Sequence, residues 1–168
     1  MCQLTTSKSV IESKAAGPFA QDRPARSVEH DRLEVFIGKW INEGYVVDRD
    51  GHESSRILTS DTYEWVPGRF FVLHKAYGRI GNLDVGATEI IAYDAEARGY
   101  VAYLFDSNGG INRSALTANA DEWTWKGEAA GCTAVFTEAG TVQTAHHVRL
   151  DDRGRWVPSM EVVLRKII

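Results

Sequence analysis

The sequence predicts an all-β protein, an up-and-down antiparallel β-barrel of about ten strands whose one end is plugged by a short N-terminal helix. Short segments of alternating polar and apolar residues follow one another from Trp40 onward. Turn residues such as Pro67-Gly68 and Ala139-Gly140 separate them. No long helical pattern interrupts the series, so neighbouring strands should pair antiparallel. Closing such a meander removes its exposed edges, although a β-sandwich is the alternative.

The chain is expected to divide into a flexible polar tail at 1–26 and one barrel domain at 27–168. Ser27 should cap a short helix that ends at Gly38. The strands are expected at 40–47, 56–66, 69–77, 85–93, 99–105, 111–118, 122–127, 132–138, 142–150 and 156–167.

The composition limits which partners and which cellular compartment are expected for the protein. The chain has 168 residues, 43% of them hydrophobic, which suits one domain with a core. The net charge of −4 and the lack of a basic stripe exclude a nucleic-acid footprint. No apolar run approaches the ~20 residues of a membrane span. Cys2 and Cys132 lie too far apart in the sequence to indicate a disulfide framework, so a cytoplasmic protein is expected. The N-terminus Met1-Cys2-Gln3-Leu4 lacks a basic region followed by an apolar core, so no signal peptide is expected.

Cross-strand partners share a face, which lets the hairpins assign inward residues. A symmetric turn at Pro67-Gly68 pairs Asp61 with His74 and puts both on the inner face. The inner face of this hairpin should also carry Tyr63, Trp65, Phe70 and Val72.

In the next hairpin Tyr93 should pair with Tyr100. One of its faces is free of charge and is expected to point inward, with Thr88, Ile90, Ala92, Val101, Tyr103 and Phe105. Later in the chain, Trp123 and Trp125 alternate with polar residues and should also point inward. His146 and His147 must point to opposite faces, and the sequence leaves open which one is interior.

An imidazole beside a carboxylate could serve as a general acid–base pair or could bind the polar group of an apolar ligand. His74 and Asp61 are therefore the catalytic candidates. A buried pair without a function, or a surface pair, is the plainer alternative. The candidate ligand-binding residues are Tyr63, Trp65, Phe70, His74, Tyr103, Phe105, Trp125 and His146. Adjacent strand residues cannot bind one ion from the same side, so no metal is expected.

Several stretches resemble one family. The segment 33–40 with Gly38-Lys39-Trp40, then Trp65-Val66-Pro67-Gly68, Ala92-Tyr93-Asp94 and Phe105-Asp106-Ser107, resembles the calycins, which include lipocalins and fatty-acid-binding proteins. The similarity is closer to a bacterial family of uncharacterised lipocalin-like domains. The resemblance implies that Arg165 packs across Trp40 and closes one barrel end.

The leading hypothesis is that the barrel binds a small hydrophobic or amphipathic molecule, as a monomer or homodimer and without a cofactor. An enzyme, perhaps an isomerase, cyclase or lyase, that uses His74 and Asp61 is the first alternative. The second is haem binding, since nitrobindin barrels look similar in outline. The stretch Pro158-Ser159-Met160 has no histidine where those barrels place the ligand, which leaves Met160, His74 or His146 as iron ligands.

Overall fold

The computed structural model describes residues 25–167, so most of the expected tail lies outside the described residues. The helical segments are α1 (Val28–Arg32), η1 (Leu33–Phe36) and η2 (Glu138–Gly140). The strands are β1 (Gly38–Val47), β2 (Glu53–Trp65), β3 (Phe71–Ile80), β4 (Leu83–Asp94), β5 (Gly99–Asp106), β6 (Ile111–Asn119), β7 (Glu122–Lys126), β8 (Ala130–Thr137), β9 (Val142–Leu150) and β10 (Trp156–Lys166).

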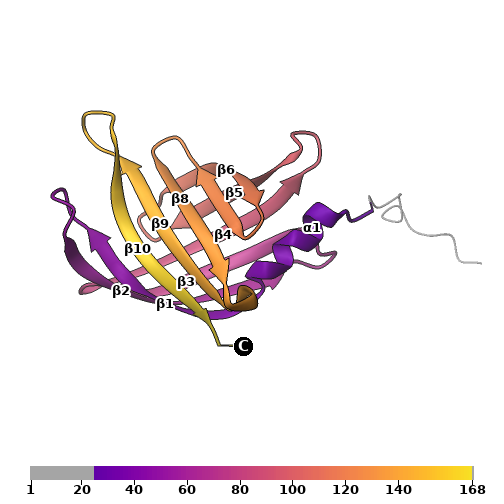
Figure 1. The fold of residues 1–168 in the computed structure, drawn as a ribbon, viewed down its shortest axis with the longest axis horizontal. Coiled ribbons are helices and arrows are strands. Elements are labelled where there is room, and N and C mark those ends of the chain that lie inside the picture. The colour runs from indigo at the N-terminus through magenta and orange to yellow at the C-terminus, as the bar shows by residue number, and fades with distance from the viewer. Residues whose placement is uncertain (1–24, 168) are drawn as a thin grey trace, which may run out of the picture.

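The ten strands form one closed barrel, as the sequence predicts (Figure 1). Every strand pairs antiparallel with the next one in the sequence, and β1 pairs with β10 to complete the ring. Two glycines on the inner face allow neighbouring strands to approach closely. A Cβ at Gly44 would overlap the backbone carbonyl of Glu161, and one at Gly78 would overlap that of Leu58.

The helical segments close one end of this barrel, as expected from the sequence. The backbone N–H of Ser27 donates to Nδ1 of His30 over 3.1 Å, which caps α1. At the other end of the plug, the indole N–H of Trp40 donates to the Phe36 carbonyl over 2.8 Å. Leu33, Phe36 and Trp40 are at most 1% exposed, so they anchor the plug in the core.

The cation over Trp40 is Lys166, and the expectation of Arg165 is wrong. The Lys166 ammonium lies 4.7 Å from the centre of the indole ring. Trp40 pairs with Lys166 across the β1–β10 seam, whereas Arg165 pairs with Ile41 and is exposed. Because side chains alternate between faces, a register that differs by one residue exchanges the inner and outer cation.

The inward face of the first hairpin is as expected. Ile57, Asp61 and Tyr63 of β2 are buried, and Val72 of β3 is fully buried. The pairing is shifted by two residues from the symmetric turn, so His74 pairs with Tyr63 and not with Asp61. A shift of two keeps every side chain on its face, and therefore the inner set is unchanged.

The inward face of the second hairpin is the reverse of the expected one. Tyr93 does pair with Tyr100, as predicted. However, Ile91 and Ala102 are at most 1% exposed, while Ile90 is 39% exposed on the other face. The reason is that Glu89, which shares the face of Ile91, is buried with polar partners, so the presence of a charge does not mark this face as outer.

Within residues 25–167, none of the helices combines the length and the apolar character that a membrane crossing needs.

Candidate functional site

A histidine held between two carboxylates lies on the inner wall of β2, β3 and β4. Nε2 of His74 is 3.0 Å from Oδ2 of Asp61, and its Nδ1 is 3.0 Å from Oε2 of Glu89. The side chains of Asp61, Glu89 and His74 are only 4%, 8% and 12% exposed. We call these three residues the acid–histidine cluster.

The strand register builds this cluster. His74 pairs directly with Tyr63 on β2 and with Glu89 on β4, so all three share the inner face. Asp61 lies two residues before Tyr63 on that face, and its carboxylate is within reach of the imidazole. The ring of Tyr63 stacks on the imidazole, with centroids 3.9 Å apart and planes 6° apart.

Each carboxylate has a further donor that fixes its position. The hydroxyl of Thr59 lies 2.6 Å from Oδ1 of Asp61. The indole N–H of Trp125, on β7 across the barrel interior, donates to Oε1 of Glu89 over 3.2 Å. These bonds orient both carboxylates toward His74 and link two separate parts of the barrel wall.

The surroundings of His74 favour the charged imidazolium. Burial by itself lowers the pKa of His74. The hydrogen bonds to Asp61 and Glu89, together with their charges, outweigh this effect and raise the pKa to about 9. Burial, with the charges of Asp61 and Glu89, also raises the pKa of Tyr63 well above its usual range. The carboxyl groups of Asp61 and Glu89 thus both face the single imidazole of His74, which is held in its charged form.

A thiol and a second imidazole lie near Glu89. Sγ of Cys132 is 3.7 Å from Nε2 of His147. Burial, together with the charge of Glu89, raises the pKa of the Cys132 thiol to about 12. Burial lowers the pKa of His147 to about 4, against the opposing effect of Glu89. Both groups are therefore neutral at pH 7, and they add weak donors and acceptors to the interior without adding charge.

Buried acceptors without a hydrogen-bond partner also lie on the inner wall of β1 and β9. Gln143 on β9 is 5% exposed, and its Oε1 has no partner among the described residues. Oδ1 of Asn42 on β1 is in the same situation. Both residues pair with Leu164 of β10, so they share the inner face in one row across three strands. Unpaired buried acceptors are costly, and a bound donor would satisfy them.

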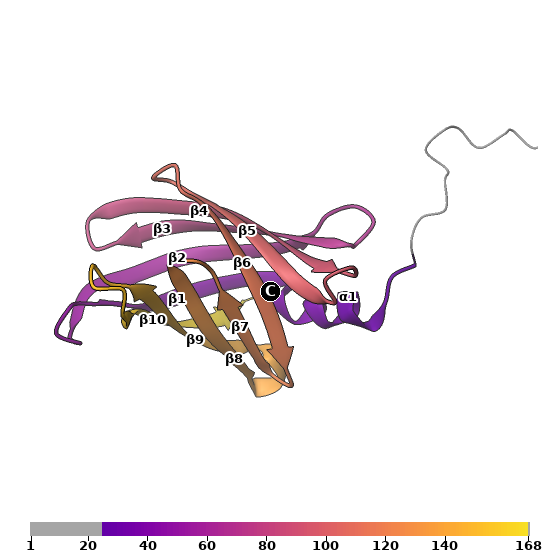
Figure 2. The same cartoon turned by 90° about the horizontal axis from the view of Figure 1, so that it is seen from above.

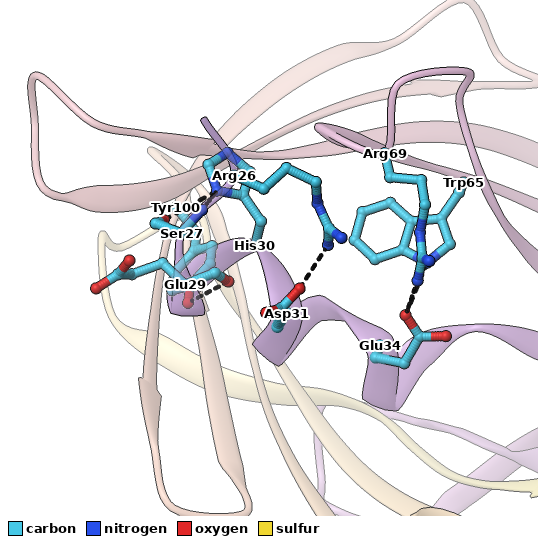
Figure 3. A network of polar contacts seen from close by, with 9 residues as sticks. All are labelled: Arg26, Ser27, Glu29, His30, Asp31, Glu34, Trp65, Arg69 and Tyr100. Atoms are coloured by element: carbon cyan, nitrogen blue, oxygen red, sulfur yellow. Dashed lines mark hydrogen bonds and ion pairs between the residues drawn. The ribbon is translucent and has the colours of Figure 1, made fainter. Parts of the chain in front are cut away.

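Two of the expected ligand-binding residues lie at the plugged end. The indole N–H of Trp65 donates to Glu34 of η1 over 2.9 Å, and the guanidinium groups of Arg26 and Arg69 lie 5.1 and 5.2 Å from its ring centre (Figure 3). Arg69 and Glu34 also form an ion pair (Figure 3). Trp65 thus fastens the plug to the β2–β3 hairpin.

Phe70 also lies at this end. Its ring meets that of His30 edge-on at 5.1 Å. Both rings line a surface hollow of about 590 Å³ between α1 and the turns that follow β2 and β4. Phe70, which directly precedes β3, therefore contacts the plug and does not belong to the acid–histidine cluster.

Three other candidate residues lie on the outer wall. The inward orientation predicted for Tyr103 and Phe105 is wrong, and the open choice between His146 and His147 falls on His147 as the interior residue. Tyr103 and Phe105 are 43% and 44% exposed and alternate with the inward Ala102 of β5. The side chain of His146 is 57% exposed and faces Glu161. Its neighbour His147 takes the inner position, because His147 pairs with Cys132 on the interior row.

The sequence correctly placed Tyr63, His74, Asp61 and Trp125 on the inner wall but did not place Glu89 there. A signal for Glu89 was present in the alternation of β4. Glu89 shares a face with Ile91 and Tyr93, and two large apolar side chains would be exposed if that face were the outer one. The Cys132–His147 contact had no local signal, since 15 residues separate the partners.

Comparison with known structures supports the fold. The crystal structure of Rv2717c from M. tuberculosis matches with a TM-score of 0.61 and 11% sequence identity, over 82% of this chain and 96% of that chain. At this identity the likeness shows the fold alone, a closed ten-stranded antiparallel barrel. No family model matches the sequence. No curated protein matches it either.

Proposed function

We propose that the barrel binds a small amphipathic molecule in its interior, in the manner of lipocalin-like proteins, and that the polar group of this molecule is a cation or a hydrogen-bond donor. The observation that carries the proposal is the buried acid–histidine cluster, in which two carboxyl groups share the single imidazole of His74. Within residues 25–167, neither Asp61 nor Glu89 forms an ion pair with a lysine or an arginine.

Charge and hydrogen-bond capacity both support a donor-bearing ligand. Each carboxylate oxygen of Asp61 and Glu89 has one protein donor and retains further lone-pair capacity. The unpaired oxygens of Asn42 and Gln143 add acceptors elsewhere on the inner wall. An ammonium or amidinium group would find a negative site in a medium of low dielectric constant, where charge interactions are strong. The apolar rest of the ligand would contact the aromatic inner wall.

The same geometry disfavours the acid–base enzyme considered from the sequence. Both ring nitrogens of His74 are already hydrogen-bonded to carboxylates, and its raised pKa makes it a poor proton acceptor at neutral pH. Haem binding stays a prediction. Of its three candidate ligands, His146 lies on the outer wall and His74 has no free nitrogen, which leaves Met160.

Three probes of equal chain length test the proposal. Octylamine, octanol and octanoate are titrated at pH 7 into the full-length protein, and tryptophan fluorescence and calorimetry report binding, with Trp125 next to Glu89 as the internal probe. We expect octylamine to bind more tightly than octanoate by at least about tenfold, with octanol between them.

Substitutions show whether the cluster causes this preference. Glu89→Gln keeps the shape and an acceptor for Trp125 but removes a charge, so the preference for octylamine over octanol should disappear. The matched control is Glu43→Gln on the outer wall, where the Glu43 side chain is 53% exposed, and it should leave the preference unchanged. Equal or tighter binding of octanoate, or a preference that survives Glu89→Gln in a folded variant, would contradict the proposal.

A further inference from the structure

Large apolar side chains are exposed together on the outer wall of β3, β4, β5 and β6. Tyr103 and Phe105 of β5 are 43% and 44% exposed, Ile90 of β4 is 39% exposed, and Ile111 of β6 is 72% exposed. Phe71 of β3 adds a side chain that is 45% exposed. These residues, with Leu73 of β3, define the outer apolar face.

The strand register makes this face continuous. Leu73 pairs with Ile90, and Ile90 pairs with Tyr103, so one unbroken apolar row crosses three strands. Phe105 pairs with Ile111 in the next row. Figure 2 shows β3, β4 and β5 side by side along one wall of the barrel. A contiguous apolar patch of this kind is typical of an interaction surface, unlike single exposed apolar residues.

Opposite charges terminate the central row. At the β2 end, the exposed Glu64 pairs with Leu73. At the β6 end, the exposed Arg113 pairs with Tyr103, and its Nε donates to the Tyr103 hydroxyl over 3.3 Å. Neither Glu64 nor Arg113 belongs to any ion pair found among residues 25–167. The row is thus acidic at one end, apolar in its centre and basic at the other end.

We propose that the outer apolar face is the interface of a homodimer. A two-fold axis that lies in the interface, parallel to β4, reverses the order of strands between the copies. Glu64 of each copy then faces Arg113 of the second copy, and Leu73 faces Tyr103 of the second copy. Ile90 lies on the axis and contacts its own counterpart. Self-complementarity of this kind is what an isologous interface requires.

The size and charge of the face fit this occupant. Strands lie about 4.8 Å apart, so four strands and three rows of side chains cover roughly 20 Å in each direction. That footprint of about 400 Å² per partner, widened by the charged rim, corresponds to the small interfaces of reversible complexes, which lie below the ~800 Å² per partner of a standard interface. A lipid surface would favour basic residues around the whole rim, whereas this rim has an acidic end at Glu64.

Charge reversal tests both the dimer and its axis. Sedimentation velocity of the full chain at micromolar concentration should show a dimer. Glu64→Arg and Arg113→Glu each place two like-charged pairs across the interface, and each should weaken dimerisation by at least about tenfold. An equimolar mixture of the two variants restores both opposite-charge contacts, so heterodimers should form. The double variant in one chain should also dimerise.

Two further measurements complete the test. Ile90→Asp brings two carboxylates together on the axis and should give a folded monomer, with folding checked by circular dichroism. Glu122→Arg and Arg153→Glu change exposed charges away from the face and should leave the dimer intact. A monomeric wild type, a dimer insensitive to Ile90→Asp in a folded chain, or a mixture of the single variants that stays monomeric would overturn the proposal.

Discussion

The inner wall of β2 to β5 holds ionisable residues among its apolar core residues, whereas the outer wall of the same strands exposes large apolar side chains. Antiparallel sheets commonly place apolar residues on the core side and polar residues outside. Here the inner wall holds Asp61, His74 and Glu89, while the outer wall exposes Ile90 and Tyr103. A charged group can be buried when hydrogen-bonding partners within the protein replace the solvent. His74 supplies a partner for both carboxylates, and therefore charge can face inward.

The strongest test of this comparison separates an inner carboxylate from an outer one. Asp61→Ala should lower the free energy of unfolding by about 3–5 kcal/mol, because it leaves a buried imidazolium with one partner fewer. Glu43→Ala, which removes an exposed ion pair with Arg56, should cost at most about 1 kcal/mol. Urea unfolding of both variants measures the difference. Equal costs would mean that the inner wall is as well hydrated as the outer one.

The pH dependence of stability should report the same cluster. The pKa of His74 is raised from 6.5 to about 9 on folding, so its contribution is fully present below pH 6.5 and is lost as the pH rises through 9. This contribution is about 3 kcal/mol, since each pKa unit corresponds to about 1.4 kcal/mol. Urea unfolding at intervals across this range measures it in the wild type and in His74→Gln. The wild type should lose this stability relative to the variant, and parallel curves would contradict the assignment.

The smallest effect is expected where adjacent residues of β10 face opposite ways. Lys166→Met removes the inner cation from the ring of Trp40 and should cost about 0.5–2 kcal/mol. Arg165→Met changes the exposed neighbour and should stay within about 0.5 kcal/mol. Thermal unfolding of both variants decides between them. A larger cost at Arg165 would reverse the assignment of faces at this end of the barrel.

Local patterns were sufficient for much of the site. The alternation around Tyr63 and Val72 identified the inner face of the first hairpin, and it remained correct although the register was off by two. Trp125 was placed inward by the polar residues on either side. The predicted inner face of the second hairpin was wrong because the face without charged residues was taken to be the inner one. That rule cannot recognise a buried Glu89 whose partners, His74 and Trp125, come from other strands.

The sequence by itself determined the number of strands, their antiparallel order and the plug at Trp40, because alternation, turn residues and capping residues act over a few positions. Only the tertiary structure decided which cation covers Trp40 and which histidine faces inward. It also decided that the pair of His74 and Asp61 has a third member in Glu89. Those outcomes depend on the register at closure between strands that are distant in the sequence, where a shift of one residue moves a side chain from one face to the other.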